Sequence, residues 1–319
     1  MGSRAIFKVV SLLIAIRAIV GLMIFALFSC CSKNIDPLIQ YTDGNLQIFE
    51  KGIISTDSNH EGISFISKDY DEIIFTRSSK DFKTSHLIYS KFKKGIWSTP
   101  KAISMTNSNY EAGIAFSPDM KKAFFTNKAP IKNKSLKDEW NIWQVDVASA
   151  QAYNKDSARP LEVPVNSDSM DCCITMNSNG TTLFSSNRDG TWDIYLAKYE
   201  NGGFENIKKL SGAINSNIYD EWPSFINDDE NIIFFSSIRK DGFGGDDLYY
   251  SKYDNGKWSK AKLFDDKFNS SSYEDSAFIT KDGEYLFFSS WRPTSFSKEV
   301  SNIYIKRIDN EFNKSIAID

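Results

Sequence analysis

The chain has 319 residues, of which 41% are hydrophobic and 25% are charged, so it can bury a globular core. The sequence has 38 basic and 41 acidic side chains and no local run of basic residues, which argues against nucleic-acid binding. The only histidines are His60 and His86, which leaves few candidate residues for most His-ligated metal sites and Ser-His-Asp triads. We therefore expect neither a bound metal nor a cofactor.

The N-terminal segment 1–29 differs from the rest of the chain and predicts an export signal. It has three basic residues and no acidic one, and residues 18–28 form an unbroken apolar run of signal-peptide length. A small residue then precedes Cys30, which resembles the lipobox of bacterial lipoproteins. That resemblance implies cleavage before Cys30 and lipidation of its side chain. The alternative is an uncleaved transmembrane helix, which would place Arg17 near the bilayer centre at high cost.

The predicted mature chain begins with the lipidated residue and a short polar tether over 30–37. Loss of three basic residues leaves 35 basic and 41 acidic side chains, a net charge of −6. Anionic lipid repels such a body, so we expect the lipid anchor alone to hold it to the membrane. The expected location is the bacterial cell envelope, at the outer membrane. We expect the periplasmic face, because no acidic residue directly follows Cys30 as in some surface-exported lipoproteins.

Five copies of one pattern fill the remainder of the chain. Each copy has an acidic residue, a turn, an apolar strand ending in small hydroxyl residues, a variable loop and another strand. Four of them continue through a short polar turn to an aromatic residue, as in a tight hairpin. Each copy thus predicts four short antiparallel strands. The acidic residues that open the copies are Glu61, Glu111, Asp171, Glu221 and Glu274.

Four-stranded units repeated without a long helix predict an all-β fold, a β-propeller formed by a single domain over 38–319. The predicted blades span approximately 59–108, 109–167, 168–217, 218–271 and 272–319. Segment 38–58 resembles the outer-strand segments of other copies, so we expect it to supply the outer strand of the last blade and close the ring. The alternative has six blades, the sixth built from both chain ends.

Some copies carry the residues of a known repeat. Ser117-Pro118-Asp119 resembles the SPDG turn of WD40-like (PD40) propeller repeats, and the equivalent turn holds 281–283 (KDG). Residues 184–190 (FSSNRDG) and 193–195 (DIY) match the motif that follows this turn in that family. The resemblance covers approximately 46–318 and implies a TolB-like propeller. Members of this type include periplasmic propellers that bind partner proteins across one face, lipoproteins, and propellers attached to peptidases.

The five repeated acids, here called the ring acids, are the first candidate site residues. We expect them at the start of the innermost strands, around one mouth of the central channel. An arginine follows the second strand in three blades and should form a structural ion pair with the acid of its own blade. These arginines are Arg188, Arg239 and Arg292. Ser79 and Ala129 occupy this position in the first two blades, and the only nearby cations are Arg77 and Lys128. As an alternative to a structural role, Glu61 and Glu111 would lack a fixed partner and could bind a cation or a basic partner group.

Aromatic residues flank the ring acids and are the second set of candidates. They either pack between blades or form a surface that stacks on a glycan or anchors a peptide. They are Tyr110, Tyr219, Trp222, Tyr273 and Trp291.

Two further features allow a structural and a functional interpretation. The adjacent Cys172 and Cys173 either pack as small residues in a strand or close a strained vicinal disulfide in an oxidising compartment. The acidic, glycine-rich segment 241–247 is interpreted as a flexible hairpin loop. Calcium binding is the alternative, but the loop lacks the alternating spacing of calcium ligands.

Enzymatic function finds little support in the motifs. Segment 186–192 resembles a sialidase Asp box, but its Asp189 and Gly190 are adjacent, which breaks the pattern. The GxSxG elbow of hydrolases is absent. The ring acids could supply a carboxylate pair, but acids that recur at one position favour a scaffold. We therefore predict a non-catalytic module that binds an envelope protein through the channel mouth. The alternative is a propeller that binds or hydrolyses a glycan.

Overall fold

The computed structural model describes residues 36–131, 139–149, 151–308 and 312. Two compact units divide the chain, 1–36 and 37–319, and the fold below is that of the second unit. The predicted signal segment and Cys30 lie outside the described residues. Within the described ranges, no helix has the length and apolar character needed to cross a membrane.

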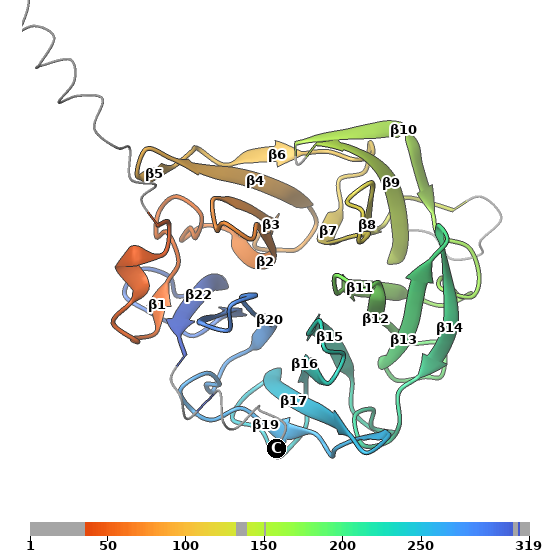
Figure 1. Cartoon of the computed structure of the whole chain (residues 1–319). Coiled ribbons are helices and arrows are strands. Elements are labelled where there is room, and N and C mark those ends of the chain that lie inside the picture. The colour runs from red at the N-terminus through yellow and green to blue at the C-terminus, as the bar shows by residue number, and fades with distance from the viewer. Residues whose placement is uncertain (1–35, 132–138, 150, 309–311, 313–319) are drawn as a thin grey trace, which may run out of the picture. The chain divides into compact units, whose positions relative to one another are not determined.

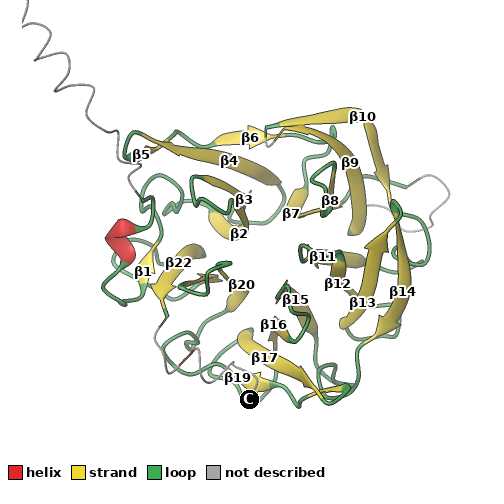
Figure 2. Ribbon diagram, in the orientation of Figure 1, coloured by secondary structure: helices red, strands yellow, loops and turns green. Residues whose placement is uncertain are grey.

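Five antiparallel sheets surround a central axis as the blades of a β-propeller (Figures 1 and 2). In each blade the strand that begins with a ring acid, or one residue before it, is innermost, and the following strands lie successively further out. Inner strands of neighbouring blades contact one another around the axis. The predicted all-β propeller with five blades is confirmed, and the six-bladed alternative is wrong.

The bounds of the strands follow the repeat. Blade one contains β2 (His60–Ile66), β3 (Glu72–Ser78), β4 (Ser85–Lys93), β5 (Ile96–Trp97) and β6 (Lys101–Ile103). Blade two contains β7 (Glu111–Phe116), β8 (Lys122–Asn127), β9 (Asn141–Ser149) and β10 (Ala152–Pro160). Blade three contains β11 (Asp171–Met176), β12 (Thr181–Ser186), β13 (Asp193–Glu200) and β14 (Gly203–Lys209).

The last two blades complete the ring. Blade four contains β15 (Glu221–Ile226), β16 (Ile232–Ser237), β17 (Asp247–Asp254), β18 (Lys257–Trp258) and β19 (Lys262–Leu263). Blade five contains β20 (Glu274–Ile279), β21 (Tyr285–Ser290), β22 (Asn302–Arg307) and β1 (Gln47–Ile48). A 3-10 turn, η1 (Ile39–Tyr41), precedes β1.

The N-terminal segment closes the ring as predicted. Strand β1 pairs antiparallel with β22, so that Ile48 lies opposite Tyr304. The N–H of Phe49 then donates to the carbonyl of Ile303 at 2.8 Å. The outer strand of blade five therefore comes from the start of the domain and its other three strands from the end, which joins the two ends of the chain.

The core consists of five clusters, each between two neighbouring blades. The second strand of a blade contributes to two of them, because both of its faces are buried. In β8, Phe125 packs toward blade one and Phe124 toward blade three. Phe234 and Phe235 of β16 divide in the same way. Burial on both faces explains why these strands read as continuous apolar runs, and each blade depends on both neighbours.

The small hydroxyl residues at the end of the second strands connect blades. The Oγ1 of Thr76 accepts from the N–H of Gly113 in the next inner strand at 2.9 Å. Thr126 Oγ1 accepts from the N–H of Cys173 at 3.2 Å. Ser185 Oγ donates to the carbonyl of Glu221 at 2.9 Å. A short hydroxyl side chain is suited to this position because it spans adjacent inner strands without filling the channel.

Candidate functional site

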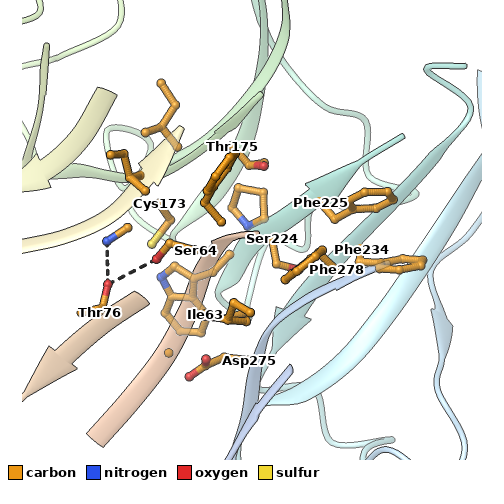
Figure 3. A pocket seen from close by; sticks show the side chains of 18 of the residues that line it. Ile63, Ser64, Thr76, Cys173, Thr175, Ser224, Phe225, Phe234, Asp275 and Phe278 are labelled. Atoms are coloured by element: carbon orange, nitrogen blue, oxygen red, sulfur yellow. Dashed lines mark hydrogen bonds between the residues drawn. The ribbon is translucent and has the colours of Figure 1, made fainter. Parts of the chain in front are cut away.

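The inner strands enclose an axial cavity of about 1130 Å³, which is the site we consider. Figure 3 shows side chains from several blades around it, among them Ser64, Cys173, Ser224 and Asp275. At the end where the inner strands begin, aromatic and acidic side chains line the cavity, and we call this end the mouth. The volume is large enough for a ligand of oligosaccharide size.

A β-bulge interrupts every inner strand and shapes the cavity wall. In three blades the second residue after the ring acid has a positive φ: 59° at Gly113, 56° at Cys173 and 55° at Ser276. Blades one and four hold Ile63 and Pro223 there, and a β-branched residue or a proline resists this conformation. Non-glycine residues in the left-handed region are strained, and such positions concentrate at functional sites.

The ring acids begin the inner strands as predicted, but they do not form a binding face. Each is at most 1% exposed. Each carboxylate accepts a hydrogen bond from a backbone N–H of the loop that leads into its own blade. The prediction that Glu61, Glu111, Asp171, Glu221 and Glu274 bind a partner is corrected accordingly. Their carboxylates are buried and already partnered, so a docking loop cannot reach them.

The three predicted arginine pairs are present and extend this arrangement. The guanidinium nitrogens lie 2.8, 2.9 and 3.4 Å from the carboxylates of Asp171, Glu221 and Glu274. Each guanidinium also lies over a tyrosine ring of the third strand. Arg188 additionally donates to the carbonyl of Val165 in the loop before blade three. Acid and arginine together clamp the connection between two blades.

The first two blades differ from each other. In blade one, Arg77 Nε lies 2.9 Å from the carboxylate of Glu61. Arg77 precedes the predicted arginine position, but it lies directly opposite Glu61 in the β2–β3 register and can therefore form the pair. The expectation that Glu61 is free is therefore wrong. Among the described residues Glu111 forms no ion pair, but its carboxylate accepts from the N–H and Oγ1 of Thr106 at 2.6 and 2.7 Å. Burial raises the pKa of Glu111. Lys128 lies instead over the ring of Tyr110.

Two aromatic clusters line the mouth. In the first, three rings surround Trp291. Their centroids lie 4.3 Å (His60), 5.5 Å (Tyr273) and 5.7 Å (Phe82) from the centroid of Trp291. Tyr273 is 49% and Phe82 39% exposed, so this cluster faces solvent. His60 Nδ1 accepts from a backbone N–H, and burial lowers the pKa of its imidazole, which favours a neutral ring.

In the second cluster the ring of Trp140 stacks on Tyr110 at 6.4 Å and lies tilted against Trp192 at 5.7 Å. Tyr110 and Trp140 line the cavity, whereas Trp192 belongs to the cluster without lining it. Of the predicted aromatic candidates, Tyr110, Trp222, Tyr273 and Trp291 line the cavity, whereas Tyr219 does not. The cavity residues His60, Phe82 and Trp140 are additions that the repeat pattern did not indicate.

Two carboxylates at the mouth of the cavity were not predicted as site residues. Asp246 and Asp275 both line it, and both depart from the repeat. Asp275 follows a ring acid where other blades hold Gly62, Ala112, Cys172 and Trp222. Asp246 directly precedes β17, the third strand of blade four, and a tryptophan occupies the equivalent position in blades two and three. These departures are the sequence signal that could have identified them.

Burial and the charges of neighbouring acids raise the pKa values of these two carboxyl groups. Burial, and then the charge of neighbouring Asp275, raise the pKa of Asp246 to about 7. Burial also raises the pKa of Asp275, and the nearby Glu274 adds to this. Oδ1 of Asp246 is buried without a hydrogen-bond partner among the described residues. At neutral pH the Asp246 carboxyl group is therefore populated in both protonation states and can either donate or accept a hydrogen bond.

We expect the Asp275→Asn substitution to lower the pKa of Asp246 by about one unit, because removal of a like charge favours the ionised form. Carboxyl carbon shifts of labelled aspartate followed against pH would measure this change. Asp229→Asn is the matched control, since Asp229 is an exposed carboxylate at the opposite end of the same cavity. An unchanged Asp246 titration in Asp275→Asn would show that the two carboxylates do not interact.

The glycine-rich loop before β17 has a packing role at the mouth. Asp247 Oδ2 accepts from the N–H groups of Phe243 and Gly244 at 2.9 and 3.1 Å. A Cβ on Gly245 would lie 2.4 Å from the ring of Tyr273. The loop is thus packed closely against blade five and positions Tyr273. Within the described part of the chain, no cluster of three or more His, Cys, Asp or Glu could hold a metal ion.

Comparison with known proteins identifies the fold and no family. No family model and no curated protein match the chain, so its resemblance to PD40 repeats gains no support from them. The endo-arabinase of Bacteroides thetaiotaomicron superposes with a TM-score of 0.51 at 13% identity, over 81% of this chain and 97% of that one. GH43B of a Bacteroides ovatus xyloglucan PUL gives 0.50 at 12% identity, over 84% and 55%.

TolB propellers are also among the structural neighbours. TolB from Acinetobacter baumannii superposes with a TM-score of 0.46 at 14% identity. The match covers 79% of this chain but spans only 55% of the length of that TolB chain. At 12–13% identity, the likeness to the two Bacteroides proteins shows a shared fold and nothing finer.

Proposed function

We propose that the protein is a carbohydrate-binding β-propeller whose site is the mouth of the axial cavity. The observation that carries this proposal is that one cavity wall combines aromatic rings with two repeat-breaking carboxylates, Asp246 and Asp275. Aromatic faces pack against the C–H faces of sugar rings, and carboxylates form strong hydrogen bonds with hydroxyl groups. The scaffold function predicted from the ring acids loses its basis because those acids are buried.

We propose binding rather than hydrolysis. Glycoside hydrolysis needs one carboxyl group that holds a proton and a second that stays ionised, so their pKa values must be separated. Here burial raises the pKa of both Asp246 and Asp275. The same cause acts on both carboxyl groups, so it does not separate one acid from one base.

A protein partner is the second candidate, favoured by an apolar patch on blade four. Ile218, Ile238 and Phe243 are 73%, 41% and 46% exposed. They lie in the loops before β15, after β16 and before β17, which antiparallel strands bring to the mouth end of the blade. An envelope protein that covers this patch would bind beside the cavity, not inside it.

We also propose that the predicted lipid on Cys30 holds the propeller in the bacterial envelope.

Calorimetric titration of the full chain in detergent with arabinan and xyloglucan oligosaccharides would test the carbohydrate proposal. We expect binding that weakens about tenfold or more in Trp291→Ala, because a stacking face is lost at the centre of the site. Trp291→Phe keeps a ring and should retain most of the affinity. Tyr253→Ala removes a 40% exposed aromatic residue of β17 that does not line the cavity and should change nothing.

Three outcomes would contradict the proposal. Equal affinities of the wild type and Trp291→Ala would exclude the mouth as the site. Release of shorter oligosaccharides would overturn the assignment of a binding protein and favour a hydrolase. Capture of an envelope protein by both the wild type and Trp291→Ala, without glycan binding, would favour the apolar patch of blade four.

A further inference from the structure

The adjacent cysteines of blade three break the repeat on the cavity wall. Their Sγ atoms lie 3.1 Å apart, and both are free thiols in the structure. Of the five inner strands, β11 alone carries two neighbouring cysteines. The same two positions hold, in the other blades, Gly62–Ile63, Ala112–Gly113, Trp222–Pro223 and Asp275–Ser276.

The β-bulge is what brings the two thiols together. In a regular strand, consecutive side chains point to opposite faces, so adjacent cysteines cannot meet. The β11–β12 register shifts between Cys172 and Thr175, and Cys173 has a φ of 56°. Cys172 pairs with Ser185 in the ladder, whereas Cys173 has no ladder partner and its N–H donates to Thr126 Oγ1. A change in the geometry of Cys173 therefore breaks no β11–β12 pairing.

The two thiols differ in access. Both residues line the cavity, but Cys173 is half-buried (Figure 3), whereas Cys172 is 1% exposed. Burial raises the pKa of the Cys172 thiol. A small oxidant entering the cavity would therefore reach Cys173 first, and Cys172 would stand behind it as the second thiol.

We infer that Cys172 and Cys173 are a redox-active pair whose oxidised state is a vicinal disulfide on the cavity wall. The oxidant is a disulfide. The Cys173 thiolate attacks one of its sulfurs, which forms a mixed disulfide and releases one thiol. Cys172 then loses its proton and attacks Sγ of Cys173, which closes the Cys172–Cys173 bond and expels the second thiol. Two electrons pass to the oxidant, and the two cysteine protons end on the two released thiols.

Equilibration of the full chain in detergent with glutathione buffers tests this inference. After acid quenching, denaturation and alkylation, trypsin releases a peptide over 156–188 that contains these two cysteines and no other. As the share of oxidised glutathione rises, we expect the doubly alkylated peptide to be replaced by an unalkylated disulfide peptide. Its mass should be two hydrogen atoms below that of the reduced, unalkylated peptide.

Single substitutions separate the two roles. In Cys172→Ser we expect the reaction to stop at a glutathione mixed disulfide on Cys173, because the second thiol is missing. In Cys173→Ser we expect the remaining buried thiol to stay largely unmodified in the folded protein. A wild-type peptide that stays doubly alkylated at every glutathione ratio would overturn the inference. So would a wild-type mixed disulfide that never resolves.

Discussion

The Asp171→Ala substitution is expected to lower the free energy of unfolding by about 3–5 kcal/mol, the usual effect of removing one member of a buried ion pair. Asp171 is fully buried, and its carboxylate accepts from Arg188 at 2.8 Å and from the N–H and Oγ of Ser167 at 2.6 and 2.9 Å. The alanine would leave a guanidinium without its counter-charge and a loop N–H without an acceptor.

Urea unfolding, followed by circular dichroism, would measure this loss as a lower midpoint with an unchanged slope. Asp168→Ala is the matched control, because Asp168 is an exposed carboxylate in the same loop and should change the free energy by less than about 0.5 kcal/mol. Asp171→Asn keeps an acceptor without the charge and should fall between the two. Equal midpoints for Asp171→Ala and Asp168→Ala would show that the ring acid does not clamp the blade connection.

This clamp explains why the ring acids are so visible in the sequence. Each blade must fix the loop that enters it, so the same acid recurs at the same place. Glu274 repeats the arrangement of Asp171, with Ser270 N–H at 2.8 Å and Arg292 at 3.4 Å. An interaction needed once per blade is structural. Function is instead expected where a blade departs from the pattern, as at Asp246, Asp275 and the cysteine pair.

The fold was predictable because its determinants are local and occur five times. Turn residues, apolar second strands and the hydroxyl residues at their ends indicated the strands, and the resemblance of segment 38–58 to an outer strand indicated the closure. The arginine pairs were also predictable, since Arg188 and its equivalents each lie four residues after the last phenylalanine of the second strand. None of this required knowledge of side-chain direction.

The site was less predictable because it depends on direction and on register. A ring acid can be assigned to a strand start from sequence, but whether its carboxylate faces the channel or the entering loop cannot. The Glu61–Arg77 pair was missed because it joins residues opposite each other in two strands, whereas the pattern compared positions along the chain. The cavity wall depends on bulges, whose positive φ at Cys173 has no signature in residue type.

The largest predicted effect on ring closure concerns Phe49. We expect Phe49→Ala to lower the free energy of unfolding by about 3–5 kcal/mol, through lost burial and the cavity it leaves. Phe49 is fully buried between the two chain ends, and its ring packs edge-on against Trp97 and Phe287 at centroid distances of 5.7 and 5.2 Å. The substitution therefore weakens the contact between the N-terminal segment and the C-terminal strands of blade five, which the β1–β22 pairing and side-chain packing hold together.

The Phe124→Ala variant is the control that distinguishes the effect of lost core packing from the effect of lost ring closure. Phe124 is equally buried, but it packs against Tyr199 and Phe204 between blades two and three, which the chain connects directly. Both variants should lose similar stability. Amide hydrogen exchange should differ, because only Phe49→Ala frees β1 from β22, so protection there should fall first. Uniform loss of protection in both variants would mean that the contact between the two chain ends is no weaker than the other blade interfaces, and that β1 contributes packing but no clasp.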